Sequence, residues 1–390
     1  MSKSQVTAAA GSTRAVDVAD VVDVVIVGGG VMGCAIALRL AQRGLKVTVV
    51  ERGIPGAEAS SAAAGILAPQ WEAEGPGPLL DLGLRSRALY PSFAAELRNI
   101  AGIDVGYAKS GLLEVALDEA QERALSTRRA WQVARGLRVD SLAAAELHAA
   151  EPRLGPNVRW GLRLPDEGHV NARALARALS QAAAIAGAEF LQGRYVRRVV
   201  TDGSRATGVE LDGQTVSAGT VVIAAGSWSS LVEGSGVPPP IVRPARGQLV
   251  AIEMRPPLFR HVVAAPGGGY LVPRLDGVAL AGSTVEMVGY RKEVTVAGLS
   301  EILSMVRSLV PALDHAAVVE TWANFRPFTE DHLPVLGRTP VDGLILATGH
   351  YRYGILLTPV TAQVISELIA TGDSSVDLAP FSVNRFAGSE

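Results

Sequence analysis

Residues 21–51 read VVDVVIVGGGVMGCAIALRLAQRGLKVTVVE, and this stretch decides the fold. The apolar, β-branched run 21–27 is typical of a buried parallel strand. A glycine-rich turn follows, and then a helical pattern that ends near Arg43. A second apolar run, 47–50, ends in the acidic residue Glu51. The order strand, glycine turn, helix, strand and acidic residue predicts a dinucleotide-binding unit, for either FAD or NAD.

Each glycine of the turn, Gly28-x-Gly30-x-x-Gly33, has a separate physical task. Gly28 permits the tight turn, Gly30 lets the backbone approach a pyrophosphate, and Gly33 lets the helix lie close to the strand. The N-terminus of the helix supplies free N–H groups and a partial positive charge for the pyrophosphate. Glu51 is placed to accept hydrogen bonds from the two hydroxyls of an adenosine ribose.

Composition narrows the class of protein. A chain of 390 residues with 48% hydrophobic and 19% charged residues is typical of a globular enzyme with room for two domains. The net charge of −2 gives no reason to expect a nucleic-acid partner. We find no apolar run long enough to cross a membrane and no secretory signal, and we expect residues 1–20 to be a flexible leader. One cysteine, Cys34, excludes a disulfide framework and suits a reducing cytoplasm.

The rest of the chain alternates helical and strand-like patterns. We expect helices at 79–100, 118–135, 172–186 (with Asn171 as N-cap), 298–310 and 358–370. We expect strands at 189–191, 270–274, 278–282 and 344–347, a hairpin-like passage at 201–214 and a β-rich stretch from 241 to 281. The predicted fold class is therefore α/β and α+β, with a Rossmann-like domain interleaved with a mainly antiparallel domain. We expect the dinucleotide domain to comprise 21–90, 165–240 and 325–386, and the substrate domain 91–164 and 241–324.

Three further segments favour FAD over NAD. The small residues of 52–67, RGIPGAEASSAAAGIL, allow the backbone to wrap a bulky flavin, and Ser60 and Ser61 can donate to its phosphate or ribityl oxygens. The strand 220–226 ends in Ala-Ala-Gly, which can press against the cofactor, and Trp228 can cover it. A second strand–glycine–helix unit around Gly349 and Gly354 can aim a helix N-terminus at the flavin pyrimidine carbonyl.

At this point the chain resembles a known family, the D-amino-acid-oxidase superfamily of flavoproteins, over about residues 21–386. Within it the chain most resembles the glycine oxidases, which are associated with making the thiazole of thiamine. The motifs are GGGVMGCAIA (28–37), EASSAAAGILAP (58–69), AAGSWS (224–229), RGQ (246–248), YLVPR (270–274), WANFRPFTEDHLPVLG (322–337) and GHYRYGILLTP (349–359).

The resemblance implies noncovalent FAD and oxidative deamination of a small amino acid or amine. In that reaction a hydride passes from the α-carbon to flavin N5, water hydrolyses the imine, and O2 regenerates the flavin with formation of H2O2. It also implies a homo-oligomer. The expected cofactor contacts are Gly28, Gly30, Val31, Met32, Gly33, Glu51, Arg52, Ala59, Ser60, Ser61, Ala64, Gly65, Ile66, Val196, Ala225, Gly226, Trp228, Gly349, His350, Arg352, Tyr353, Gly354, Ile355 and Leu356.

The resemblance assigns three residues to substrate. Arg326 matches the arginine that clamps the substrate carboxylate, a task that suits the fork of a guanidinium. Tyr270 matches a tyrosine that faces the carboxylate or caps the pocket, and Arg352 an arginine between flavin and substrate. The structural alternatives are an ion pair of Arg326 with Glu330 or Asp331, core packing of Tyr270, and a surface position for Arg352.

The chain departs from the pattern of the well-known bacterial glycine oxidase at two places. Gly267, Gly268 and Gly269 replace bulkier residues that include a histidine, and Val285 replaces a methionine. These changes predict a roomier pocket, which leaves sarcosine, small D-amino acids and cyclic imino acids open beside glycine. An alternative function is an amino-acid dehydrogenase that passes electrons to a non-oxygen acceptor, and another is a flavin-bearing subunit that mainly assembles with a partner chain. The six histidines show no metal-ligand spacing, so we expect no metal site.

Overall fold

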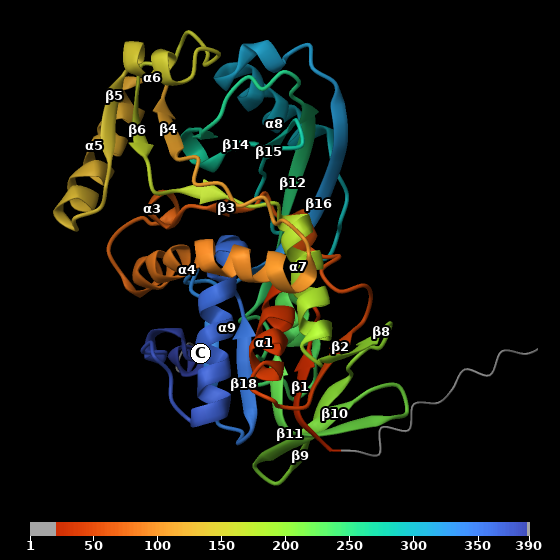
Figure 1. Ribbon diagram of the computed structural model, residues 1–390. Coiled ribbons are helices and arrows are strands. Elements are labelled where there is room, and N and C mark those ends of the chain that lie inside the picture. The colour runs from red at the N-terminus through yellow and green to blue at the C-terminus, as the bar shows by residue number, and fades with distance from the viewer. Residues whose placement is uncertain (1–20, 388–390) are drawn as a thin grey trace, which may run out of the picture.

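The computed structural model describes residues 21–387 and folds them around two large β-sheets (Figure 1). The first sheet lies in the lower part of the view and the second in the upper part, and helix α4 (Pro78–Ala101) crosses between them. The expected leader, residues 1–20, lies outside the described residues. Strands of the first sheet come from 22–51, 189–223 and 335–348, and strands of the second from 112–164 and 243–328. The division into domains at the boundaries given above stays a proposal.

The first sheet is built around β1 (Val22–Val27), which pairs in parallel with β2 (Val47–Glu51) and with β11 (Thr215–Ile223). The strand order is β17-β18-β11-β1-β2-β8, and the β9–β10 hairpin pairs with β11. The remaining strands of this sheet are β8 (Glu189–Gln192), β9 (Arg198–Asp202), β10 (Arg205–Glu210), β17 (Val335–Arg338) and β18 (Leu344–Thr348). The strands predicted at 21–27, 47–50, 189–191 and 344–347 and the hairpin at 201–214 are confirmed.

Helix α1 (Val31–Ala41) packs between α7 (Ala172–Ile185) and α9 (Gly354–Thr371) and shares one apolar core with them and with α4. Asn171 caps α7 as predicted, because its side-chain oxygen accepts a hydrogen bond from Ala174 N at 3.0 Å. Helix α4 is confirmed within one residue at each end.

Helix α9 begins at Gly354, four residues before the predicted start, and contains Pro359. A proline inside a helix leaves the carbonyl four residues earlier without its N–H donor. That carbonyl belongs to Ile355, and the hydroxyl of Tyr90 on α4 donates to it. The long-range hydrogen bond therefore lets the helix run through the proline, and sequence periodicity could not reveal it.

The second sheet has the order β16-β12-β15-β14-β13-β4-β6-β5 and is antiparallel apart from the β13–β4 pair. Its longest strands, β12 (Arg243–Glu253) and β16 (Val318–Phe328), pair along most of their length. The other strands are β4 (Leu112–Ala116), β5 (Asp140–Ala143), β6 (Trp160–Leu164), β13 (Val262–Ala264), β14 (Tyr270–Pro273) and β15 (Val278–Gly282). Strands β14 and β15 were predicted from the sequence, whereas β4, β5 and β6 were not.

Three helices accompany the second sheet: α5 (Glu119–Ala134), α6 (Ala144–Ala150) and α8 (Val296–Leu309). Helices α5 and α8 confirm the patterns at 118–135 and 298–310, and Asp118 is the N-cap of α5. Short elements link the two sheets, namely α2 (Ala59–Ala62), β3 (Ile66–Leu67), α3 (Pro69–Glu72) and β7 (Gly168–His169). The 3-10 helices are η1 (Gly226–Leu231), η2 (Pro266–Gly268), η3 (Pro311–Leu313), η4 (Tyr351–Tyr353), η5 (Ala379–Phe381) and η6 (Val383–Phe386).

One helical segment, Tyr351–Thr371, is long and apolar enough to cross a membrane by length and composition, contrary to our expectation. Two thirds of its most apolar window (67%) is buried inside the fold, where α9 packs on α1 and α4. Its apolar character therefore matches that of a core helix.

We expect Tyr90→Phe to lower the free energy of unfolding by about 1–3 kcal/mol, because the carbonyl of Ile355 would lose the hydroxyl that takes the place of the N–H missing at Pro359. Tyr107→Phe is the matched control, since Tyr107 stacks on Tyr90 and its hydroxyl makes no hydrogen bond within residues 21–387. Denaturant unfolding of both variants checks this. Equal stability of the two variants would contradict the explanation given for Pro359.

Candidate active site

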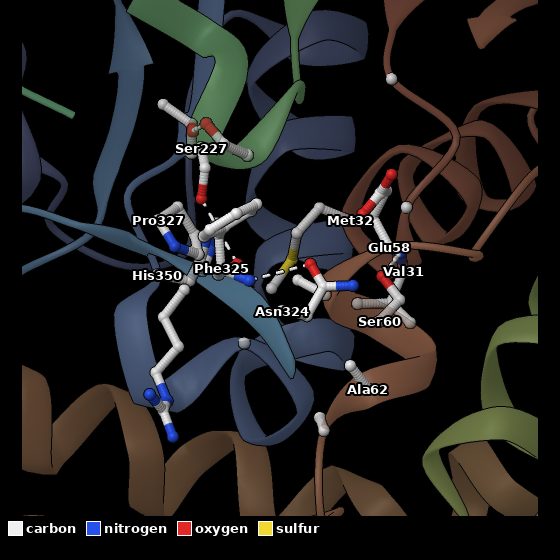
Figure 2. A pocket seen from close by; sticks show the side chains of 18 of the residues that line it. Val31, Met32, Glu58, Ser60, Ala62, Ser227, Asn324, Phe325, Pro327 and His350 are labelled. Carbon is white, nitrogen blue, oxygen red and sulfur yellow. Dashed lines mark hydrogen bonds between the residues drawn. The ribbon is translucent and has the colours of Figure 1, made fainter. Parts of the chain in front are cut away.

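A cavity lined by residues of both sheets lies where the two sheets meet. The carboxyl ends of β1, β2 and β18 and the residue after β11 line one part of it, with Val27, Val50, Ala347 and Ala224 on the wall. The second sheet contributes Gly247, Leu249, Tyr270, Ser283 and residues 324–327. Figure 2 shows part of this lining, with Val31, Glu58 and Ser60 on the right of the view, Phe325, Pro327 and His350 on the left, and Asn324 between them.

The turn after β1 lies too close to the neighbouring backbone for side chains, so it needs glycine. Gly28 has a φ of 106°, and a Cβ there would lie 2.6 Å from the carbonyl oxygen of Ala224. A Cβ on Gly33 would lie 1.9 Å from the carbonyl oxygen of Gly28. The N–H groups of Gly30 and Met32, both on the cavity wall, have no hydrogen-bond partner among residues 21–387. This glycine-lined helix start fits the pyrophosphate of a dinucleotide.

Glu51 stands at the end of the cavity expected to hold the ribose. Its Oε2 accepts from Gly29 N and its Oε1 from Gly53 N, both at 2.8 Å, and these bonds orient the carboxylate. Arg194, Tyr195 and Val196 lie on the same cavity, and of these only Val196 was anticipated.

Trp228 lies on the cavity wall, as expected, but its ring already has two close partners within the protein. The guanidinium of Arg52 lies 3.7 Å from the ring centroid, and the ring of Tyr290 stacks on Trp228 at 5.7 Å. Arg52 and Trp228 thus form one cation–π unit in the wall.

Three of the expected cofactor residues do not line the cavity: Gly33, Ser61 and Gly349. Gly33 acts through packing of α1 on the turn. The Ser61 hydroxyl donates to Gly56 O at 2.5 Å, so our expectation that it donates to the cofactor finds no support. Ser60 does line the cavity, and its Oγ accepts from Val31 N at 3.0 Å. Gly349 makes room for Thr329 and Val335, because a Cβ there would come within 2.9 Å of Thr329.

The structure brings the three expected substrate residues, Arg326, Tyr270 and Arg352, onto one cavity. Arg326 Nη1 donates to the carbonyl oxygen of Thr284 at 3.1 Å, and Nη2 donates to Ser283 Oγ at 2.5 Å. Both acceptors are neutral, and Arg326 has no carboxylate partner in the described part of the chain. Glu330 pairs instead with Arg243, and Asp331 with Arg385.

Tyr270 is buried, with 7% of its surface exposed, and its ring meets Trp71 edge-on at 6.2 Å. Its hydroxyl makes no hydrogen bond within the described residues. It is therefore available to a ligand, although the ring also packs in the core.

Arg352 does not stand free, because Glu72 neutralises it. Nε of Arg352 lies 2.8 Å from Glu72 Oε2, and this carboxylate raises the pKa of Arg352 although burial lowers it. Glu72 also lines the cavity and was not anticipated, because nothing in the sequence links α3 to a residue 280 positions later. Other unanticipated wall residues are Gly247, Ser283, Asn324 and Tyr351.

His350 lies on the cavity but is fully buried, and its Nε2 is 3.1 Å from Thr361 Oγ1. Burial lowers the pKa of His350 to about 3, so the ring stays neutral at physiological pH. Of the two departures, Gly268 lies beside Arg352, but neither Gly267–Gly269 nor Val285 lines the cavity, and the roomier pocket stays a prediction.

Comparisons with known proteins agree with this geometry. The family described as FAD dependent oxidoreductase matches residues 23–368. The chain is 38% identical to the glycine oxidase of Geobacillus kaustophilus, over 94% of this chain and 97% of that protein. The crystal structure of that enzyme superposes with a TM-score of 0.90 and covers 93% of this chain and 98% of its own. The chain is also 39% identical to the bifunctional protein ThiO/ThiG of Synechocystis, over 93% of this chain and 54% of that longer protein.

We expect Glu51→Gln to weaken FAD binding by about 10- to 100-fold, because an amide gives up one charge-assisted acceptor. Fluorescence titration of the FAD-free protein measures this dissociation constant. Glu189→Gln, an exposed change on the neighbouring strand β8, is the control. A dissociation constant within twofold of the control would contradict a role for Glu51 in holding the ribose.

Proposed function

This chain belongs to the FAD-dependent oxidoreductase family, and from that premise we propose that it oxidises glycine to glyoxylate, ammonia and hydrogen peroxide. The observation that carries the proposal is Arg326, a guanidinium on the cavity wall whose described partners are all neutral. A cation in such a place favours an anionic ligand, and the planar fork of arginine suits a carboxylate.

The other charges near the cavity make this assignment specific. Arg352 is neutralised by Glu72, and Arg52 lies over Trp228 and pairs with Glu58. Arg194 also lines the cavity without a carboxylate partner among the described residues, but its backbone N–H donates to Glu51 O, which places it at the ribose end. Arg326 is thus the cation best placed to bind one substrate carboxylate, with the hydroxyl of Tyr270 as a second donor. This pattern favours a substrate with a single carboxylate, as in glycine, and it supports the similarity to glycine oxidases.

The glycine turn after β1, Glu51 and the residues around Trp228 would hold FAD, which would supply the redox chemistry that oxidises glycine and reduces O2 to H2O2. The protein's residues bind and orient the amino acid. Arg326 and Tyr270 hold its carboxylate, and the Glu72–Arg352 pair forms part of the wall beside it. Water hydrolyses the imine product to glyoxylate and ammonia. The overall reaction converts glycine, O2 and water to glyoxylate, ammonia and H2O2.

The proposal extends to the cellular setting. We place the enzyme in the cytoplasm, as a homo-oligomer, in a reaction sequence that makes the thiazole of thiamine. Similarity to a bifunctional ThiO/ThiG protein supports the last point. The single cysteine, Cys34, is buried, which suits a reducing compartment.

Product analysis tests the proposed reaction. The FAD-loaded protein in air should form glyoxylate, ammonia and H2O2 from glycine in equal amounts, with one O2 consumed per glycine. Glyoxylate formed without oxygen uptake, and only when a quinone is added, would favour the dehydrogenase alternative. No glyoxylate under either condition would reject glycine as substrate.

We expect Arg326→Ala to lower kcat/KM for glycine by about 10- to 100-fold, because a charge-assisted hydrogen bond to the carboxylate is lost. Most of this loss should be an increase in KM. Arg205→Ala removes an exposed arginine that pairs with Asp342 and serves as control. Steady-state kinetics of both variants, with FAD content checked by absorbance, give the comparison. An unchanged KM in Arg326→Ala would remove the carboxylate-binding role.

A further inference from the structure

The side chain of Arg326 lies across strand β12 at the one position where β12 has no side chain. In the β12–β16 pair, Ala245 lies opposite Arg326 and Gly247 opposite Asn324. A Cβ on Gly247 would lie 2.2 Å from Arg326 Nη1, 2.4 Å from Nη2 and 2.5 Å from Cζ. Only glycine therefore lets the guanidinium keep this position.

The far side of the guanidinium is held by the loop that follows β15. Thr284 O and Ser283 Oγ accept from its two Nη atoms. Thr284 is fixed in turn, because its Oγ1 accepts from Gln248 N at 3.1 Å and donates to Glu286 Oε1 at 2.6 Å.

A partly buried ion pair anchors this loop to β12. Arg246 Nη2 donates to Glu286 Oε2 at 2.5 Å, and the backbones of the two residues exchange hydrogen bonds of 2.9 and 3.0 Å. Arg246 is only 4% exposed. Partial burial by itself would raise the pKa of Glu286, but hydrogen bonds from Arg246, Thr284 and Gln248 lower that pKa to about 2. The carboxylate of Glu286 is thus taken up by Arg246 and makes no hydrogen bond to Arg326.

We propose that Gly247, together with Ser283 and Thr284 on the loop anchored by Arg246 and Glu286, is a positioning unit that aims the Arg326 guanidinium at the substrate carboxylate. This inference rests on the proposed function, because it requires that Arg326 bind a carboxylate. It also gives a physical role to the Arg-Gly-Gln segment 246–248: Arg246 anchors the loop, Gly247 clears the path of the guanidinium, and Gln248 supports Thr284.

Gly247→Ala tests the unit without dismantling the fold. The added methyl group meets only the end of a flexible arginine side chain, so the arginine moves while the strand stays paired. The measurement is the dissociation constant of acetate, read from the change it causes in the visible absorption of bound FAD. Acetate carries the carboxylate of glycine without its amine, so it reports on the carboxylate site alone.

We expect Gly247→Ala to weaken acetate binding about 10-fold or more, while Gly75→Ala, at an open position, leaves it unchanged. In an Arg326→Ala background the Gly247→Ala change should have no further effect on kcat/KM for glycine, because the two residues act as one unit. A purely structural role for Gly247 would instead give additive losses.

The outcomes separate this inference from the proposed function. If Arg326→Ala weakens acetate binding but Gly247→Ala stays within twofold of wild type, the positioning unit is rejected and the carboxylate clamp stands. If Arg326→Ala has no effect on acetate, both are rejected. Should Gly247→Ala fail to retain FAD, Ser283→Ala decides, because it removes one hydroxyl and adds no atoms. A two- to tenfold weaker acetate complex supports the unit, and an unchanged one overturns it.

Discussion

The close approach of helix α1 to the end of strand β1 is the constraint on which the cavity depends. A Cβ on Gly33 would come within 1.9 Å of the carbonyl oxygen of Gly28, so the helix can begin this close to the turn only because Gly33 has no side chain. The N–H groups of Gly30 and Met32 have no hydrogen-bond partner among the described residues, and the neighbouring parallel strands β2, β11 and β18 end at the same edge. The absence of a side chain at Gly33 thus places the phosphate site at the same sheet edge as the strand ends that line the cavity.

The second sheet completes the cavity and contributes the guanidinium of Arg326 to its wall. Strands β12 and β16 pair along most of their length and carry Arg326 from the second sheet to the edge of the first. The charges around the cavity then follow a simple division. Glu72 compensates Arg352, Glu58 pairs with Arg52, and Arg326 meets only neutral acceptors. Arg194 also lacks a carboxylate partner among the described residues, but it lies beside Glu51 at the ribose end. The positive charge of Arg326 is therefore left uncompensated in the substrate part of the site, which favours one substrate carboxylate.

Local pattern was enough to predict the β1–α1–β2 unit, the cap at Asn171 and helices α4, α5 and α8, because their periodicity and end signals lie within a short window. Arg326 and Tyr270 were expected from family motifs, and the structure brings them onto one cavity. Glu72, Gly247 and Ser283 were missed, because each matters only through a partner far along the chain. The start of α9 was missed for the same reason, since Tyr90 on another helix compensates for Pro359.

The most direct test of the account is the visible spectrum of the FAD-loaded protein, sealed from air, before and after glycine is added. Oxidised flavin absorbs near ~450 nm, a property of the cofactor that the substrate removes by reducing it. If glycine is the substrate, adding it bleaches this band. A band that persists with glycine but is lost with sarcosine, a D-amino acid or proline would contradict the assignment of glycine. If the protein takes up no FAD, the assignment of the cavity as a flavin site is wrong.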